Sequence, residues 1–338
     1  MEKKVRRKIK KDNRVIRKFS WKLLIGFMIF QLFFTVITAP FILFYGPFQN
    51  AKSMFVGGAM GSMHYQWLAT TFLSKEQINK ILGKSEVEED VSTDGSGLIS
   101  IPKNHDDNIK YATLENNDKF RGHVLTVSDP TRIKIGYTSK LKKEGETTSQ
   151  IAENNKAVAG VNGGAFSDEA NSQAWTANGG TPSGVIITGG KVIYDDTSGS
   201  KQGTILMTKD GRLVAGNYTT KELLSKGASE AVSFNTDILV SNGKAAKLQY
   251  HMGGSSPRTI IGQKQDGSIL LVVLDSKNNN RIAATLDEAQ EIMLDLGCVT
   301  AATLDGGKSA TMYYNDEVVN TPSYAFGERY IPTAVIVK

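Results

Sequence analysis

An acidic residue and two glycines end an apolar stretch near the C-terminal end of the chain, in the segment TLDGGKSATM. A carboxylate in this place can act as a general base or stabilise a cationic centre, and backbone N–H groups beside glycine can bind an anion. Asp-Gly-Gly is also ordinary turn chemistry when it stands alone. The segment supplies six candidate site residues: Asp305, Gly306, Gly307, Lys308, Ser309 and Thr311.

Three other apolar runs carry a polar residue at one end. AVAGVNGGAFSD places Asn162 and Gly163 after a hydrophobic strand. GGSSPRTIIG brings Arg258 into the start of a strand, and ILLVVLDSK ends at Asp275. Burying an unpaired charge is costly, so such residues need a partner or a ligand. The four segments favour one shared pocket for an anionic, hydroxyl-rich ligand, and a buried bridge from Arg258 to Asp275 or Asp305 is the structural alternative.

Short β-rich runs separated by glycine turns surround these segments across residues 111–338. GVIITGGKVIYD predicts a hairpin whose two-residue turn is Gly189-Gly190, and Asp-Gly and Asn-Gly turns recur further on. Two helices are predicted to interrupt the strands, at 147–155 and at 285–297. The sequence therefore predicts an α+β domain built mainly from antiparallel sheet with a few helices.

The positive charge of the chain lies at its N-terminal end. The formal net charge is +6, but residues 1–22 hold eleven Lys and Arg against two acidic residues, so the remainder is mildly acidic. A domain that binds nucleic acid carries its basic surface on the folded part of the chain. The charge distribution therefore argues against a nucleic-acid partner.

An apolar stretch follows the basic tail. Residues 23–45 contain no charged side chain, and about 23 residues at ~1.5 Å each make a helix of about 35 Å, enough to cross a bilayer. A cleaved signal peptide and a buried core helix are the alternatives. With the basic residues on the cytoplasmic side, we expect a single-pass signal anchor with the rest of the chain outside the cell. Residues 46–110 are then expected to form a helical stalk, over 63–83, and an acidic linker, over 84–110.

Other chemistries find little support. The four histidines are scattered, no Walker A or GxSxG motif occurs, and Cys298 is the only cysteine, interpreted as a core residue. An exported chain without a possible intrachain disulfide favours a bacterial source, with Gram-positive bacteria the best fit. No cofactor is predicted, and a divalent cation beside Asp275 and Asp305 stays open, although no ligand set demands one.

The clusters, in their order along the chain, resemble the phosphodiester glycosidase family, whose bacterial members are often described as exopolysaccharide biosynthesis proteins. The segments that carry the resemblance are VNGGAFSD, GTPSGVIITGGKVI, PRTIIGQKQDGSILLVVLD, ATLDEAQEIMLDLGCVTAATLDGGKSATM and VVNTPS with ERYIPTAVIV. They cover about 110–338, and the anchored N-terminal part is similar to membrane-tethered Gram-positive members. Two positions depart from the family: Lys308 replaces a glycine or small residue, and Asp275-Ser276-Lys277 replaces Asp-Gly-Arg.

The resemblance implies a hydrolase that cleaves sugar-1-phosphodiester linkages in cell-surface or exopolysaccharide glycans, with Asp305, Asp275 and Arg258 as catalytic residues. A non-catalytic module that binds or assembles anionic glycans is one alternative, and a hydrolase or transferase of wall polymers is another. The oligomeric state stays open. The substrate-binding residues implied by the resemblance are Asn162, Gly163, Gly306, Gly307, Lys308, Ser309 and Thr311.

Overall fold

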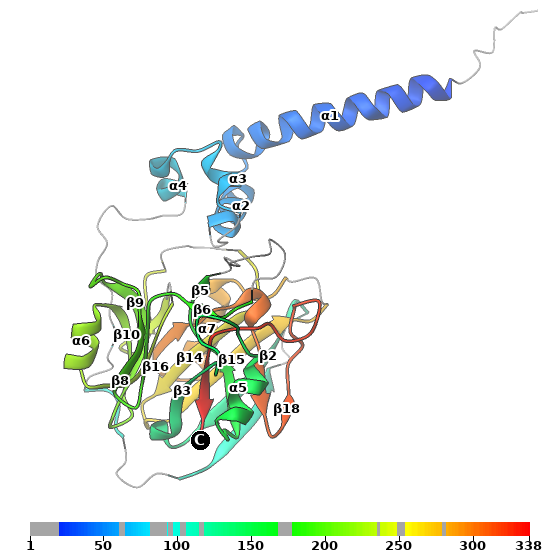
Figure 1. The fold of residues 1–338 in the computed structure, drawn as a ribbon. Coiled ribbons are helices and arrows are strands. Elements are labelled where there is room, and N and C mark those ends of the chain that lie inside the picture. The colour runs from blue at the N-terminus through cyan, green and yellow to red at the C-terminus, as the bar shows by residue number, and fades with distance from the viewer. Residues whose placement is uncertain are drawn as a thin grey trace, which may run out of the picture. The chain divides into compact units, whose positions relative to one another are not determined.

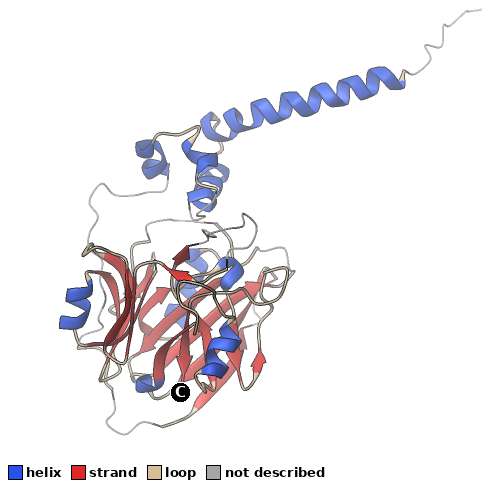
Figure 2. Cartoon of the chain, in the orientation of Figure 1, coloured by secondary structure: helices blue, strands red, loops and turns tan. Residues whose placement is uncertain are grey.

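In the computed structural model the chain forms two compact units, residues 1–52 and 53–338. Strands dominate the second unit (Figures 1 and 2). The basic tail up to residue 19 lies outside the part that the structure describes. The described residues are 20–60, 65–81, 93, 97–101, 106–114, 118–167, 178–234, 237–248, 254–278 and 282–338.

Helix α1 (Trp21–Tyr45) accounts for the apolar stretch. It follows the N-cap residue Ser20 and ends before Gly46, whose N–H donates to the carbonyl of Ile42. Its side chains are mostly exposed, as expected for a helix that has no protein partner for its apolar surface. Within the described residues, α1 is the one helix long and apolar enough to cross a membrane.

Short helices α2 (Gln49–Met60), α3 (Trp67–Thr70) and α4 (Lys75–Ile81) follow α1 in sequence. The helix predicted over 63–83 therefore breaks into two pieces, and its first residues lie outside the described part. Ser74 and Gln77 exchange backbone-to-side-chain hydrogen bonds of 2.9 and 3.2 Å, which satisfy N–H groups that the first helical turn leaves unpaired.

The segment predicted as a linker contains described residues that pack on the domain. Thr93 forms an isolated antiparallel bridge with Ala215 and is buried, and Ile99 is also buried. The rest of the 84–96 stretch lies outside the described residues.

The sheet that carries most of the candidate residues has seven antiparallel strands. Helix α7 (Leu286–Asp295) packs on one face of this sheet, where Ile260 and Met293 belong to one buried cluster. In order across the sheet, the strands are β1 (Ile109–Leu114), β2 (Phe120–Val127), β15 (Ile269–Ser276), β14 (Arg258–Lys264), β16 (Cys298–Thr303), β12 (Ile238–Ser241) and β13 (Lys244–Ala245).

Two further sheets have five strands each, and a two-stranded ribbon joins β5 (Phe166–Ser167) to β6 (Thr181–Pro182). Helix α6 (Thr220–Ser225) lies against the first of these sheets, as Figure 1 shows. The first sheet is β10 (Leu213–Tyr218), β9 (Gln202–Thr208), β11 (Ala228–Ser233), β7 (Val185–Thr188) and β8 (Lys191–Asp195). The second is β18 (Glu317–Val318), β17 (Met312–Tyr314), β4 (Ala159–Asn162), β19 (Thr333–Val337) and β3 (Ile133–Tyr137).

The largest core cluster lies where the three sheets meet. It contains Leu271 of β15, Val161 of β4 and Ile186 of β7. All eight residues of β15 are buried, because its side chains belong alternately to the cluster shared with α7 and to the cluster between the sheets. A strand buried on both sides has no reason to alternate apolar and polar residues, and this explains the continuous run ILLVVL.

The predicted fold class is confirmed. Helices α5 (Thr148–Asn154) and α7 match the predicted segments 147–155 and 285–297. The glycines of the predicted hairpin, Gly189 and Gly190, have φ angles of +56° and +74°, as a primed turn requires.

The expectation of only two helices in this region is wrong, because α6 forms after β10. Its signal was present in the sequence: Thr219 and Glu222 form a capping box, with Thr219 Oγ1 accepting from the Glu222 N–H over 3.2 Å.

Candidate functional site

The candidate residues gather at one edge of the seven-stranded sheet. Strand β14 is antiparallel to both of its neighbours, β15 and β16. Its first residue, Arg258, therefore lies at the same edge as Asp275 near the end of β15 and the turn that follows Thr303 at the end of β16. Antiparallel pairing thus brings three of the four sequence segments together.

Asn162 joins the fourth segment to this edge. Its side-chain amide donates to the backbone carbonyl of Asp305 over 2.6 Å. Its side-chain oxygen accepts from Thr259 Oγ1 at 2.6 Å and from the Thr311 N–H at 3.2 Å. The Asp305 N–H also donates to the carbonyl of Gly163. Asn162 is completely buried, so its side chain fixes the backbone of the site, while its predicted contact with substrate stays a prediction.

The glycine turn packs closely against the start of β14. The Gly307 N–H donates to the carbonyl of Pro257 over 2.8 Å. A Cβ atom on Gly306 would lie 2.7 Å from that same carbonyl oxygen, and Gly307 has a φ of +59°. A side chain at Gly306 would collide with fixed backbone, and a left-handed φ favours glycine at Gly307. These contacts with Pro257 therefore hold the backbone of the turn beside Arg258.

The polar side chains of the turn differ in accessibility. Lys308 is exposed, whereas Ser309 and Thr311 are each about 1% exposed. Their hydroxyl oxygens have no hydrogen-bond partner within the described part of the chain. Buried hydroxyls without a hydrogen-bond partner are uncommon in proteins. Each one needs an explanation, such as a bound ligand, a bound water molecule or a role at a functional site.

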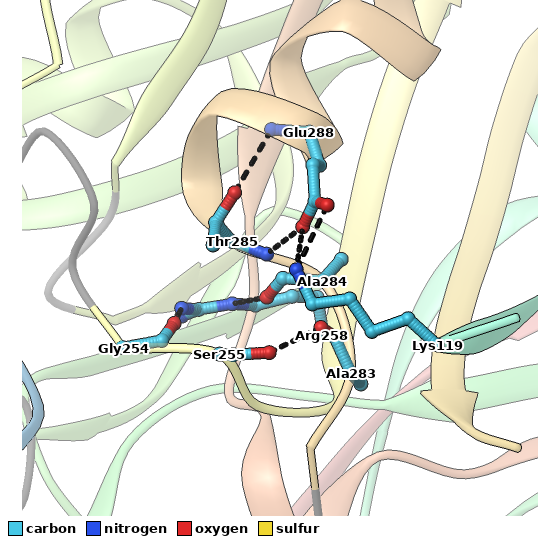
Figure 3. A network of polar contacts seen from close by, with 8 residues as sticks. All are labelled: Lys119, Gly254, Ser255, Arg258, Ala283, Ala284, Thr285 and Glu288. Carbon is cyan, nitrogen blue, oxygen red and sulfur yellow. Dashed lines mark hydrogen bonds and ion pairs between the residues drawn. The ribbon is translucent and has the colours of Figure 1, made fainter. Parts of the chain in front are cut away.

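Arg258 extends toward α7 (Figure 3). Its Nη2 donates to the carbonyl of Gly254 over 2.6 Å, and its Nε donates to the carbonyl of Ala284 over 3.3 Å. Burial lowers the pKa of Arg258 and the Asp237 carboxylate acts in the opposite direction, yet an arginine this basic stays charged. The two carbonyls orient the guanidinium without removing its positive charge.

An ion pair stands beside Arg258 at the start of α7 (Figure 3). Lys119 Nζ lies 2.8 Å from one Glu288 oxygen and 2.9 Å from the other. Glu288 also accepts from the Thr285 N–H over 2.7 Å in the capping box of α7. Burial opposes ionisation of Glu288, but the hydrogen bonds from Lys119 and Thr285 hold the pKa of this carboxyl below its usual range. This pair fixes the end of α7 that carries the carbonyl used by Arg258.

Asp275 leaves the sheet on the opposite face. Arg258 pairs directly with Leu274, and successive side chains of a strand alternate between faces. Leu274 belongs to the cluster under α7, whereas Val273 belongs to the cluster between the sheets. Asp275 therefore points away from Arg258, and this register does not favour the direct Arg258–Asp275 bridge considered from the sequence.

The Asp275 carboxylate is 1% exposed. One oxygen accepts from the Thr321 N–H over 2.6 Å, and the other lies 3.6 Å from His123 Nε2. Through this hydrogen bond the buried carboxylate holds the backbone of Thr321 in place. Its predicted catalytic role stays a prediction, as do those of Asp305 and Arg258.

The segment after β18 (Glu317–Val318) connects the glycine turn with the end of β15. Asn320 Nδ2 donates to the carbonyl of Ala310, and Asn320 Oδ1 accepts from the Met312 N–H over 2.7 Å. Ser323 Oγ donates to the carbonyl of Gly307 over 3.1 Å. Together with the Thr321 contact to Asp275, these bonds link the glycine turn to the end of β15.

His123 and Asn320 were not among the predicted site residues. Asn320 lies within VVNTPS, a segment noted only for its family resemblance. His123 stands on β2 two residues before Leu125, on the core-facing side of the strand. A polar residue in an inward position of an alternating strand is a signal that could have identified it. His251 and two other histidines lie outside the described residues.

Metal binding has limited support in the geometry. Across the described ranges, no three His, Cys, Asp or Glu side chains gather closely enough to hold a metal ion. Among the described residues, a cation beside Asp275 and Asp305 would have only these two carboxylates to bind it, and the first is buried whereas the second is half-buried. The cation site stays a prediction.

The comparisons with known proteins agree with the fold. The model of the family described as "Phosphodiester glycosidase" matches residues 155–338. Among solved structures, the zebrafish N-acetylglucosamine-1-phosphodiester alpha-N-acetylglucosaminidase catalytic domain auto-inhibited by its pro-peptide aligns with a TM-score of 0.54 and 21% identity, over 68% of this chain and 82% of that chain. This likeness concerns the fold.

Two curated proteins match at the level of sequence. The SPbeta prophage-derived uncharacterized protein YomE of Bacillus subtilis (strain 168) is 25% identical over 217 residues, 62% of this chain and 31% of its own length. The N-acetylglucosamine-1-phosphodiester alpha-N-acetylglucosaminidase of Bos taurus is 26% identical over 225 residues, 60% of this chain and 40% of its own length. The chain thus spans less than half the length of either relative. Because the family model covers more than half of the chain, this protein belongs to the phosphodiester glycosidase family.

Proposed function

We propose that the protein is a membrane-anchored, extracytoplasmic hydrolase that cleaves the bond between a sugar and the phosphodiester at its anomeric carbon. The observation that carries the proposal is the meeting of the Asp305 turn, Arg258 and Asn162 at one edge of the seven-stranded sheet. Membership of the phosphodiester glycosidase family supports the reaction class. The glycan acted on, in the cell wall or in an exopolysaccharide, belongs to the proposal.

The phosphate would bind on the side of Arg258 and the glycine turn. Arg258 supplies a fixed positive charge, oriented by the carbonyls of Gly254 and Ala284. Lys308 supplies a second positive charge on the exposed rim of the turn. Charge-assisted hydrogen bonds from arginine to phosphate are short and directional. Such donors stabilise the negative charge that develops on the leaving phosphate group.

Asp305 is the carboxylate that the proposal places next to the sugar. A phosphomonoester leaves as a stable anion, so this bond needs less help from a general acid than an ordinary glycosidic bond. What the reaction still needs is a base for the attacking water, or a carboxylate that stabilises positive charge on the sugar ring. Asp305 is half-buried, its Oδ1 accepts from the Gly306 N–H over 2.9 Å, and its backbone is fixed by Asn162.

Aromatic side chains in the segment after β18 support a carbohydrate substrate. Phe326 is 86% exposed, and its ring lies 5.6 Å from that of Tyr324 in an edge-to-face arrangement. The same segment contacts the glycine turn through Ser323. Exposed aromatic rings next to a polar site offer apolar contact area with little loss of side-chain entropy. In this proposal Phe326 packs against a sugar ring that extends from the site.

Helix α1 provides the proposed anchor. It is apolar and long enough to span a bilayer, and the Lys- and Arg-rich residues that precede it would keep that end in the cytoplasm. The domain would then meet glycans outside the cell.

The test uses the full chain in detergent micelles or nanodiscs with chromogenic glycosyl phosphodiesters of several sugars. We expect the wild type to release the sugar, and Asp305→Ala to lower kcat by about 10²–10⁴-fold, the contribution typical of a general base. Asp295→Ala, an exposed acid at the end of α7, is the control and should keep wild-type activity.

The binding alternative has its own outcome in this experiment. If wild type and Asp305→Ala are equally inactive on every sugar while both bind anionic glycan, the protein is a binding module and the hydrolase proposal is wrong. Incubation with defined wall polymers, with products identified by mass spectrometry, separates a phosphodiester hydrolase from a transferase: the first releases a free sugar and the second a new glycoside.

A further inference from the structure

A chain of polar side chains crosses three adjacent strands on the core side of the seven-stranded sheet. Tyr111 Oη on β1 lies 2.7 Å from His123 Nδ1 on β2. His123 Nε2 lies 3.6 Å from Asp275 Oδ1 on β15, and Asp275 Oδ2 accepts from the Thr321 N–H over 2.6 Å. His123 is 3% exposed and Asp275 1% exposed. Four groups distant in sequence thus form one continuous series of contacts.

The protonation of Tyr111 is compatible with one direction of hydrogen bonding along this series, from the phenol toward Asp275. Burial raises the pKa of Tyr111, the Asp275 charge adds to the rise, and Arg121 opposes it. The phenol therefore keeps its proton near neutral pH and is able to donate it to His123 Nδ1. A neutral imidazole that accepts at Nδ1 carries its hydrogen on Nε2. In this tautomer the hydrogen on Nε2 faces Asp275 Oδ1, 3.6 Å away.

The contact between His123 and Asp275 is slightly too long for a hydrogen bond. Nε2 and Oδ1 have no other hydrogen-bond partner within the described part of the chain. Hydrogen bonds in active sites are often long in the free enzyme and shorten when substrate binds. A donor and an acceptor that face each other in the protein interior, both unsatisfied, have a strong tendency to close.

Asp275 transmits its position to the glycine turn. Thr321, which Asp275 holds through its N–H, stands two residues before Ser323, whose hydroxyl donates to the carbonyl of Gly307. A rotation of the Asp275 carboxylate therefore shifts the segment that supports the backbone of the turn.

We propose that His123 is a positioning residue: together with Tyr111 it fixes the Asp275 carboxylate, which holds Thr321 and thereby the backbone of the Gly306–Ala310 turn in its active arrangement. This inference rests on the proposed function for its effect on catalysis, but the effect on Thr321 is independent of it. His123 does not contact the reacting atoms in this scheme. It acts through Asp275. In other sites, too, a supporting side chain orients the group that takes part in binding or catalysis.

Two substitutions of His123 test the role. Glutamine can place an amide N–H close to the position of Nε2, so His123→Gln should keep most of kcat. Alanine removes the donor, and His123→Ala should lower kcat by about 10–100-fold, the range seen when an orienting partner is lost, with a much smaller change in KM. Thr126→Ala, on the opposite face of β2, should leave both constants unchanged.

Hydrogen exchange at the Thr321 amide gives a second measurement that does not require activity. We expect faster exchange in His123→Ala and near wild-type exchange in His123→Gln and Thr126→Ala. If His123→Ala fails to fold, Tyr111→Phe replaces it, since the loss of the phenol frees His123 Nδ1 while the ring stays; a severalfold increase in exchange at Thr321 is then expected.

The two proposals fail in different ways. An inactive wild type whose Thr321 amide still responds to His123→Ala overturns the hydrolase and keeps the positioning chain. Unchanged exchange at Thr321 in a folded His123→Ala overturns the positioning chain, and so does an active wild type for which glutamine is no better than alanine.

Discussion

The side-chain amide of Asn162 donates to the backbone carbonyl of Asp305 over 2.6 Å, joining two residues that are 143 positions apart. The same side chain accepts from Thr259 and from the Thr311 N–H. One buried residue of β4 therefore holds β14 at Thr259, the residue after Arg258, and also holds both ends of the glycine turn. The arrangement explains why an asparagine follows a hydrophobic strand: an amide is needed to donate and accept at the same point.

Replacing Asn162 should destabilise the protein strongly. Asn162→Ala leaves the Thr259 hydroxyl, the Thr311 N–H and the Asp305 carbonyl without this partner, and each unsatisfied buried group costs about 1–3 kcal/mol. Because such costs are not additive, we expect a loss on the order of 3 kcal/mol in the free energy of unfolding, measured by denaturant titration. Asn217→Ala, at an exposed position of β10, should change stability by less than about 0.5 kcal/mol. Equal stabilities of the two variants would contradict the bracing role.

Gly306→Ala tests the close approach of the turn to β14. The added Cβ would stand 2.7 Å from the carbonyl oxygen of Pro257, and a backbone atom cannot move aside as a flexible side chain can. We expect a loss of about 1–3 kcal/mol in unfolding free energy, as for other overpacking substitutions, and a lower kcat. In Gly58→Ala the added methyl meets no atom within 4 Å, so this variant should be at least as stable as the wild type. Full activity in Gly306→Ala would show that the turn tolerates displacement.

The sequence located the ends of the strands better than their faces. Arg258, Asp275 and Asp305 interrupt apolar runs, and this signal placed them correctly at strand ends. The face of Asp275 could not be predicted, because β15 is buried on both sides and its run ILLVVL contains no alternation. The contact between His123 and Asp275 depends on the pairing register of β2 with β15, which no local pattern encodes.

Lys308→Ala tests the charge on the rim of the turn. Lys308 is exposed, and an exposed charge contributes mainly through screened, long-range attraction. We expect KM for a glycosyl phosphodiester to rise by about two- to fivefold with little change in kcat, an effect that corresponds to the ~0.4–1 kcal/mol of such contacts. The rise of KM with salt should be weaker in the variant than in the wild type. Lys191→Ala, exposed on β8, is the control, and an equal effect there would assign the change to net charge alone.

Phe326→Ala tests the contact with the sugar chain. Because the ring is 86% exposed, its removal should leave the melting temperature within about 1–2 °C of the wild type, as for surface substitutions in general. We expect KM to rise about three- to tenfold for an oligosaccharide phosphodiester, the equivalent of ~1 kcal/mol of aromatic contact, and to rise less for a single sugar. Leu224→Ala, 44% exposed on α6, should not affect either substrate. Equal effects on long and short substrates would place Phe326 outside the binding path.

Cys298 should be unreactive in the folded protein. It is 3% exposed at the start of β16, and burial raises the pKa of its thiol to about 12, with Lys264 acting weakly in the opposite direction. At pH 8 only about one thiol in ten thousand is then ionised, and the thiolate is the reactive form. We expect a thiol reagent to label the folded chain only as fast as it unfolds, and to label it at once in guanidinium. Cys298→Ala should keep full hydrolytic activity, because no step of the proposed reaction uses the sulfur atom. Rapid labelling without loss of structure, together with an inactive Cys298→Ala, would instead make Cys298 a nucleophile and contradict a reaction in which water attacks the sugar.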